Sequence, residues 1–453
     1  MGDLLAPIFC QHIPHSASWN LNWRNLGMPG PLDGINILEF TQIIAAPFGG
    51  MLLSDMGANV IKVEPVEGEP WRLHSQFLPK ESRTYMGLNR GKKSLPLNLK
   101  DPKAITILQK LINTIDVVII NARPDVPKSL GIDYEALSAI NPQIIYCDNT
   151  AFGRKGPNSH RPGYDIVVQA VSGLLAADNK IADGIPQQVS ATAVADYGTG
   201  IAIAWSICAA LFSRERTGKG QKIDTTLLGT ALAMQGSFFE LDEYTKQARL
   251  DFIEELSTLR QAGIPYETIL KQQQDLSGAS SGNIAAFRIY YTTYETSDGV
   301  IALGCLSNHL RRKAADAIGL QDPRFEEGYD PESPEMIKKI TSLQKAAKAK
   351  ISAKTTDEWL AIFDIAGVPA GPVKFVEELL DDDQVLANDM VVELEHSLAG
   401  KIRMLGPMLQ MSDTPLKAQS ASPALGEHTS EILLNLGYTS QDIDELKRNG
   451  ITY

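Results

Sequence analysis

The chain has 453 residues, which is enough for two or three domains with a large buried core. With 43% hydrophobic and 21% charged residues, its composition is that of an ordinary globular protein. A net charge of −12 argues against nucleic-acid and anionic-membrane partners, because binding to their phosphates needs a positive field.

The four cysteines are far apart and form no Cys-x-x-Cys pair, and the seven histidines are equally scattered. We therefore expect no disulfide framework, no metal site and a reducing compartment. Residues 1–16 lack the basic segment of a signal peptide. The apolar run at 201–212 is shorter than the roughly 20 residues that span a bilayer. A cytoplasmic protein without a membrane partner is the expectation.

Strands and helices alternate from residue 34 onward. Residues 34–40 ("GINILEF") and 59–64 ("NVIKVE") are predicted as buried strands on either side of a helix at 47–58, which makes a βαβ unit. Further helices are predicted at 105–115 and 134–141, and further strands at 116–122 and 143–152. This alternation predicts an α/β fold with a doubly wound, mostly parallel sheet.

Ligands of such sheets bind beyond the carboxyl ends of the strands. The segments that follow the predicted strands are 41–46, 64–65, 121–124 and 151–156. We expect them to converge on one edge of the sheet.

The pattern changes after about residue 226. A charged, helix-periodic stretch at 238–263 precedes a polar segment at 272–283, which is predicted as a loop. Residues 287–305 are predicted as a hairpin with an Asp-Gly turn, and 367–373 ("GVPAGPV") as a domain boundary. Helices are expected between the hairpin and residue 366, then strands at 390–396 and 401–407 and a helix at 429–437.

Several common nucleotide and hydrolase motifs are absent. The segment after the first strand reads "TQIIAAPFGG" and not Gly-x-Gly-x-x-Gly, and "GLNRGKKS" has the wrong spacing for a phosphate-binding P-loop. No Gly-x-Ser-x-Gly elbow occurs either. A dinucleotide-binding, nucleoside triphosphatase or serine hydrolase function is therefore not supported.

Seven basic residues lie near the predicted strand ends. They are Lys62, Arg72, Arg90, Lys92, Lys93, Lys100 and Arg123. Each alone could be a solvated surface residue. Their clustering favours an anionic ligand that carries phosphates, because charge-assisted hydrogen bonds to such a ligand are strong.

Two aspartates stand where helices are predicted to begin. Asp165, after the Pro-Gly of "HRPGYD", is predicted as an N-cap, and so is Asp196 in "VADYGTG", before a helix from Gly200. Asp196 also has a catalytic interpretation. Gly198 and Gly200 would let a ligand approach the backbone, and a carboxylate at a helix start stays ionised, as a nucleophile must. The motif alone leaves both interpretations open.

In their order along the chain, the motifs resemble the class III coenzyme A transferases, the superfamily of formyl-CoA transferase, carnitine-CoA transferase and α-methylacyl-CoA racemase. The matching pieces include "PLDGINILEFTQIIAAPFGGMLLSDMGANVIKVEP", "NRGKKSLPLNLKDP", "HRPGYDIVVQAVSGL", "VADYGTGIAIAWSICAALF" and "LGEHTSEILLNLGY". They cover most of residues 31–230 and 367–438.

The resemblance implies a Rossmann-like large domain built from both chain ends, an inserted smaller α+β domain and an interlocked homodimer. It divides the chain into an N-terminal extension (1–30), the first part of the large CoA-binding domain (31–229), the small domain with an extended helical insert (230–370), and a linker with the return to the large domain (371–453).

The resemblance also implies the chemistry. Asp196 would be the nucleophile that takes CoA from an acyl-CoA donor and passes it to a small carboxylic acid, possibly a dicarboxylic one, through a mixed anhydride and an aspartyl-CoA thioester. The implied CoA contacts are Gln42, Ile44, Ala45, Pro65, Leu97, Asn98, Leu99, Lys100, Asn121, Ala122, Arg123, Arg161, Tyr164 and Asp165. Ser281 and Gly282 match a loop that shields the substrate, and neither a metal nor a cofactor beyond CoA is implied.

The chain departs from the family pattern at several positions. Pro65 stands where formyl-CoA transferase has arginine, and "NARPDVPKSLG" replaces the usual Asn-Phe-Arg-Pro-Gly segment. Tyr164 replaces the histidine of the racemases, and tyrosine, with an ordinary pKa near 10, is a poor partner for two-base proton exchange. Transfer is therefore favoured over racemisation. An intramolecular CoA-transferring isomerase stays open beside the racemase as the second alternative, and a non-enzymatic acyl-CoA-binding protein is the third.

Overall fold

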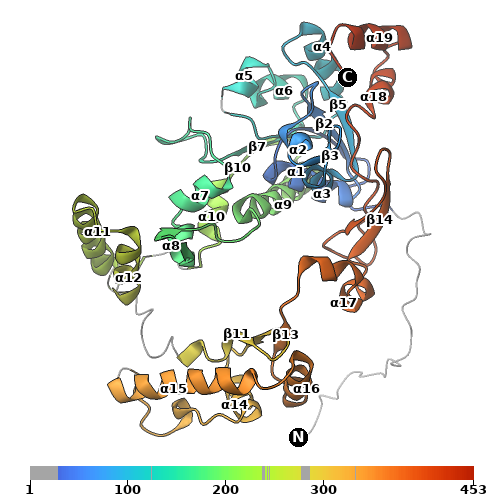
Figure 1. The fold of residues 1–453 in the computed structure, drawn as a ribbon. Helices are drawn as coiled ribbons and strands as arrows, with labels where there is room; N and C mark the ends of the chain where they lie inside the picture. Colours follow the sequence, from blue (N-terminus) through green and yellow to red (C-terminus); the bar gives the residue numbers. More distant parts are fainter. Residues whose placement is uncertain are drawn as a thin grey trace, which may run out of the picture.

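The computed structural model describes residues 29–453 apart from residues 124, 237–239, 242, 244, 277–285 and 332. Its centre is a six-stranded sheet in which every neighbouring pair is parallel, in the order β10-β7-β6-β1-β2-β5 (Figure 1). The strands are β1 (Asn36–Phe40), β2 (Asn59–Glu64), β5 (Lys92–Pro96), β6 (Val117–Ile120), β7 (Ile145–Thr150) and β10 (Gln221–Thr226). The predicted doubly wound parallel sheet is confirmed in its α/β class and strand direction.

Helices cover both faces of this sheet. On one face, α1 (Ala45–Asp55) and α9 (Val194–Thr217) pack against a core that includes Ile37, Val117 and Ile119. On the other face, α4 (Pro102–Ile112) packs against Leu38 and Val118. Consecutive strand residues thus point to opposite faces, and both faces are buried, which accounts for the nearly continuous apolar strands.

Helix α9 begins earlier than predicted. It starts at Val194, six residues before Gly200, and has 24 residues. By length and composition it could cross a membrane, and it is the single such helix in the described part of the chain. Half of its apolar window is buried inside the protein, where Ile203 and Ile207 join the core beside the sheet. A helix in the core of a protein can have the same length and apolar composition, so the burial of α9 accounts for its hydropathy.

Short elements connect the main ones. They are α2 (Pro70–Leu73), β3 (Gln76–Leu78), β4 (Glu81–Ser82), α3 (Arg83–Asn89), α5 (Val126–Ser129), α6 (Tyr134–Ile140), α7 (Asp165–Val171), α8 (Leu174–Asp178), β8 (Ile181–Ala182), β9 (Ile185–Pro186) and α10 (Leu227–Ala233). Helix α10 packs against α9 and α7 and so completes the wall beside the N-terminus of α9.

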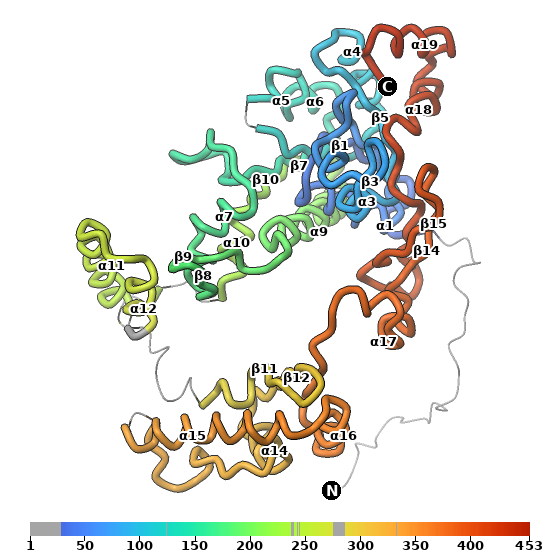
Figure 2. The backbone as a smooth tube through the Cα atoms, in the orientation of Figure 1, coloured from blue at the N-terminus to red at the C-terminus, as the bar shows by residue number. Residues whose placement is uncertain are grey.

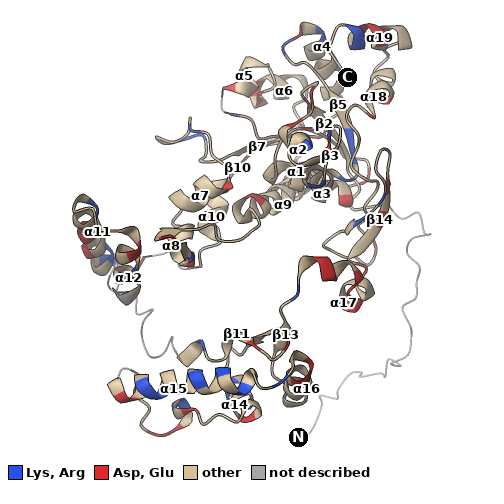
Figure 3. Ribbon diagram, in the orientation of Figure 1, with Lys and Arg blue, Asp and Glu red and all other residues tan. Residues whose placement is uncertain are grey.

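A smaller antiparallel sheet lies apart from the parallel one (Figure 2). The predicted hairpin is confirmed as β11 (Tyr291–Glu295) and β12 (Val300–Gly304), and β13 (Ala370–Pro372) adds a third strand from the "GVPAGPV" segment. The sheet shares its own core with α14 (Asn308–Ile318), α15 (Pro334–Ile351) and α16 (Thr356–Ala366), next to the 3-10 turn η2 (Pro323–Phe325). Figure 3 shows basic residues along α15, whose apolar residues face that core.

The charged stretch before the hairpin forms two helices, α11 (Lys246–Gln261) and α12 (Tyr266–Leu276). The predicted loop at 272–283 is therefore wrong for residues 272–276. Glutamine is a good helix former, so the polar "KQQQDL" run extends α12 without breaking it.

The C-terminal segment returns to the large sheet. After η3 (Val376–Asp381) and α17 (Asp383–Ala387), the two predicted strands form the hairpin of β14 (Val391–His396) and β15 (Gly400–Leu405). Helices α18 (Thr429–Asn435), which was predicted, and α19 (Ser440–Arg448), which was not, then join the core on the α4 face. Residues 451–452 lie beside the chain just after β5, where the backbone N–H of Asn98 donates to the Ile451 carbonyl at 2.9 Å.

Candidate functional site

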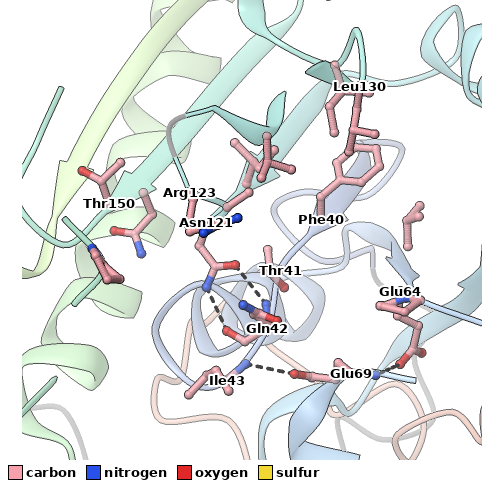
Figure 4. A pocket seen from close by; sticks show the side chains of 18 of the residues that line it. Phe40, Thr41, Gln42, Ile43, Glu64, Glu69, Asn121, Arg123, Leu130 and Thr150 are labelled. Atoms are coloured by element: carbon pink, nitrogen blue, oxygen red, sulfur yellow. Dashed lines mark hydrogen bonds between the residues drawn. The ribbon is translucent and has the colours of Figure 1, made fainter. Parts of the chain in front are cut away.

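A cavity of about 1190 Å³ lies beyond the carboxyl ends of β1, β2, β6 and β7. The segments predicted to converge at this edge do meet there, and Figure 4 shows side chains from three of them around the opening. The cavity is lined by Asp196 and by all of the candidate CoA contacts except Asp165, namely Gln42, Ile44, Ala45, Pro65, Leu97, Asn98, Leu99, Lys100, Asn121, Ala122, Arg123, Arg161 and Tyr164. Ser281 and Gly282 lie outside the described residues.

Asp196 lies in the first turn of α9 and is only 7% exposed. Burial raises the pKa of its carboxyl group to about 7, and the charge of Asp165 adds to that effect. The prediction that the helix start keeps Asp196 fully ionised is therefore wrong. At this position desolvation outweighs the helix dipole, so the carboxyl group is protonated more readily than that of an ordinary aspartate.

Asp165 is the first residue of α7 and not its N-cap, which is Tyr164. Its Oδ1 accepts hydrogen bonds from the backbone N–H groups of Ala195 at 2.8 Å and Asp196 at 3.2 Å. The carboxylate thus caps α9, 30 residues further along the chain, and satisfies two of its free donors. The Gln169 side chain donates a hydrogen bond to Oδ2 of Asp165, so the second oxygen of this carboxylate is fixed as well.

The two glycines of the motif are packing residues. A Cβ on Gly200 would lie 2.7 Å from the Ala45 carbonyl oxygen, and one on Gly198 would lie 2.1 Å from the Cε of Met234. Glycine therefore permits the close approach of α9 to α1 and α10. The helix hydrogen bonds have already begun at Tyr197, whose N–H donates to the Ala193 carbonyl, so both glycines lie inside the hydrogen-bonded part of the helix.

Most of the predicted phosphate-binding cations are structural. Arg72 is fully buried, with its Nε 2.8 Å from Glu64 Oε2 and its guanidinium 3.7 Å from the centre of the Tyr85 ring. Lys62, Lys92 and Arg90 are likewise buried in ion pairs with carboxylates, and Lys93 pairs with Glu431 at 2.7 Å. Their assignment to a ligand is therefore wrong. Lys100 and Arg123, joined by Arg161, are exposed and line the cavity.

The loop after β1 is held by side chains from three other segments, and Figure 4 shows the contacts of two of them, Asn121 and Glu69. The Asn121 amide bonds both backbone groups of Gln42, accepting from its N–H at 3.0 Å and donating to its carbonyl at 2.8 Å. Glu69 Oε2 accepts from the Ile43 N–H at 2.9 Å, and Lys62 Nζ donates to the Thr41 carbonyl at 2.8 Å. Sequence reasoning missed Glu69, because its partners are distant in the chain and no motif marks it.

The arrangement combines a buried carboxylate, Asp196, for which the described residues supply no cationic partner, with three exposed cations around the same cavity. It is suited to binding a polyanionic ligand and presenting an electrophile to Asp196. Within the described residues, no group of three or more histidine, cysteine or acidic side chains could hold a metal ion.

Comparison with known proteins gives consistent matches over most of the chain. The model of the family described as "CoA-transferase family III" matches residues 32–429. A succinyl-CoA:glutarate CoA-transferase of Mus musculus is 32% identical over 93% of this chain and 90% of its own, and an acetyl-CoA:oxalate CoA-transferase of Acetobacter aceti is 31% identical over 88% and 94%. The crystal structure of a CAIB/BAIF family protein from Brucella suis superposes with a TM-score of 0.68 at 28% identity, covering 90% of this chain and all of that one.

Proposed function

This chain belongs to CoA-transferase family III, and we propose that it moves CoA between small carboxylic acids through covalent intermediates on Asp196. The relatives are named for succinate, glutarate and oxalate, so small dicarboxylic acids are the substrate class we propose. Lys100, Arg123 and Arg161 are the residues we assign to the phosphates of CoA, because they are exposed cations in the same cavity as Asp196.

One observation carries the role of Asp196. Among the acidic residues that line the cavity, Glu64 and Glu69 are buried against cations, and Glu67 and Asp125 are exposed. Asp196 is the buried cavity carboxylate for which the described residues supply no cationic partner. A carboxylate that is neither neutralised nor well hydrated is the one best able to attack a thioester.

The reaction then proceeds in balanced covalent steps. An Asp196 oxygen attacks the thioester carbonyl, the C–S bond breaks, and CoA thiolate leaves as a mixed anhydride forms. The thiolate attacks the aspartyl carbonyl, which releases the donor carboxylate and leaves an aspartyl-CoA thioester. The acceptor carboxylate attacks that thioester and expels the thiolate, which takes the acyl group from the new anhydride and regenerates Asp196. Each step converts one activated acyl group, a thioester or an anhydride, into another. No step therefore has to activate a free carboxylic acid from an unactivated state.

Trapping with hydroxylamine tests this proposal. Incubation with succinyl-CoA and then hydroxylamine is expected to convert Asp196 to a hydroxamate that peptide mass spectrometry detects. Asp196→Ala should lose both the adduct and transfer, whereas Asp178→Ala, at an exposed position, should retain them. Full transfer by a folded Asp196→Ala variant would refute the nucleophile. Deuterium uptake at the α-carbon without an acceptor acid would instead identify the racemase alternative.

We also propose that the functional unit is a homodimer. Ile201, Trp205 and Phe212 form an apolar stripe on α9 and are 45%, 72% and 65% exposed, although the opposite side of the same helix lies in the core. A second copy of the chain would cover this stripe. Trp205→Glu should shift the mass measured by light scattering from dimer to monomer, and a wild-type chain that is monomeric would refute the proposal.

A further inference from the structure

Ile43 has an unusual backbone conformation at the edge of the cavity. Its φ is +71°, and it is the one β-branched residue among the six described non-glycine residues with positive φ. A β-branched residue is strained in this left-handed region, because its Cβ approaches the neighbouring carbonyl. Such strain persists only where surrounding groups impose it.

Glu69 is the group that meets the strained residue directly. Its Oε2 accepts from the Ile43 N–H at 2.9 Å, while its Oε1 lies 3.2 Å from Lys62 Nζ. The Glu69 side chain is 1% exposed, and its own N–H donates to Glu64 Oε2 at 3.3 Å, so both ends of the residue are fixed. The carboxylate that accepts from the Ile43 N–H is therefore itself held by its own contacts within the protein.

Ile43 lines the cavity together with its neighbours Gln42, Ile44 and Ala45. Ile44 is the N-cap of α1, and Ala45 is the first residue of that helix. A change of φ at Ile43 from positive to negative would turn the backbone on either side of it. Because Asn121 holds the backbone of Gln42 on one side, this torsion sets the direction in which the start of α1 faces the cavity on the other side.

We propose that Glu69 is a positioning residue for CoA binding, which holds Ile43 in the left-handed conformation and thereby keeps the 42–45 backbone in its binding arrangement. This inference rests on the proposed function, since it takes CoA as the ligand of the cavity. Glu69 acts through the loop and takes no part in the covalent steps.

Calorimetric titration with free CoA measures the effect without requiring transfer. Glu69→Ala removes the acceptor, so the loop relaxes and the apparent Kd for CoA should rise by about 5- to 30-fold, as expected from the intrinsic cost of the left-handed conformation. Glu69→Gln keeps an oxygen for the Ile43 N–H and should bind CoA within about threefold of wild type.

Glycine at position 43 provides the decisive control, because it adopts positive φ without strain. In the Ile43→Gly background, Glu69→Ala should change the Kd for CoA by less than about twofold. A purely structural role of Glu69, such as pairing with Lys62, predicts the same loss in both backgrounds and would overturn the inference. Equal weakening by Glu69→Gln and Glu69→Ala would overturn it as well.

Ile43→Pro tests the loop with Glu69 and its ion pair in place, and remains informative if Glu69→Ala does not fold. Proline holds φ near −65° and should weaken CoA binding at least as much as Glu69→Ala. Wild-type affinity in this variant would overturn the inference alone. A wild-type chain that does not bind CoA would overturn the proposed function together with it.

Discussion

Replacing Asp196 by asparagine should stabilise the protein while it abolishes transfer. Burial, together with the charge of Asp165, raises the pKa of Asp196 from its ordinary value of 3.8 to about 7. Between these two values the folded chain holds more protons than the unfolded chain, so the free energy of unfolding falls as pH rises. The raised pKa therefore costs the folded state about 4 kcal/mol at pH 8, where the carboxylate is ionised, and about 1.7 kcal/mol at pH 5, where the folded chain keeps the proton.

Thermal unfolding at the two pH values measures this cost. Asparagine has nearly the same shape and no charge, so Asp196→Asn should melt roughly 5 °C above wild type at pH 8, with a clearly smaller gain at pH 5. The matched control is Asp298→Asn. Hydrogen bonds from Thr356 lower the pKa of Asp298, so its replacement should lower the melting temperature at pH 8. An Asp196→Asn variant that melts at or below wild type at pH 8, or gains equally at both pH values, would refute the reasoning.

Three further outcomes are expected. Formation of the Asp196 adduct should rise with pH through a midpoint near 7, and Asp165→Asn should move that midpoint down by removing the neighbouring charge; a rate that is flat from pH 6 to 8 would contradict this. Arg72→Ala should lower the free energy of unfolding by about 3 to 5 kcal/mol in urea titrations, since it leaves buried carboxylates unpaired. Gly200→Ala should cost about 1 to 3 kcal/mol through its clash with α1, whereas Gly87→Ala, which meets no atom within 4 Å, should be neutral or stabilising in the same titrations.

The core strands were predictable because burial on both faces makes them continuous apolar runs. The predicted range for β2 agrees with the structure at both ends, and β6 lies inside its predicted range. The edge strands β5 and β10 were missed. Their sequences, "KKSLP" and "QKIDTT", show no hydrophobic period. In β5 the buried polar residues Lys92 and Ser94 are bonded to Glu39 and Glu64 of other strands, and β10 is not fully buried.

The site was predictable only where the order of motifs identified its residues. Asp196 was found in this way, but the rise in its pKa depends on surroundings that come from other segments. The same limit applies to Arg72, which looked like a ligand-binding cation because its partner Glu81 forms part of an unremarkable polar segment. The local sequence shows which residues are charged, but the partner of a buried charge is known only once the chain is folded.

The partners of the buried arginines set a time constraint on biosynthesis. Arg72 donates to the carbonyl of Pro423, 351 residues later, and Arg90 donates to the carbonyl of Leu405, 315 residues later. At about 5 to 20 residues per second, a ribosome needs roughly 20 to 70 s to reach Pro423 after it has made Arg72. In the later part of that interval, once β10 has been made, the parallel sheet has all of its strands but lacks the segment that completes its charged interior. Chaperones that hold nascent chains should therefore engage this protein until its last residues emerge.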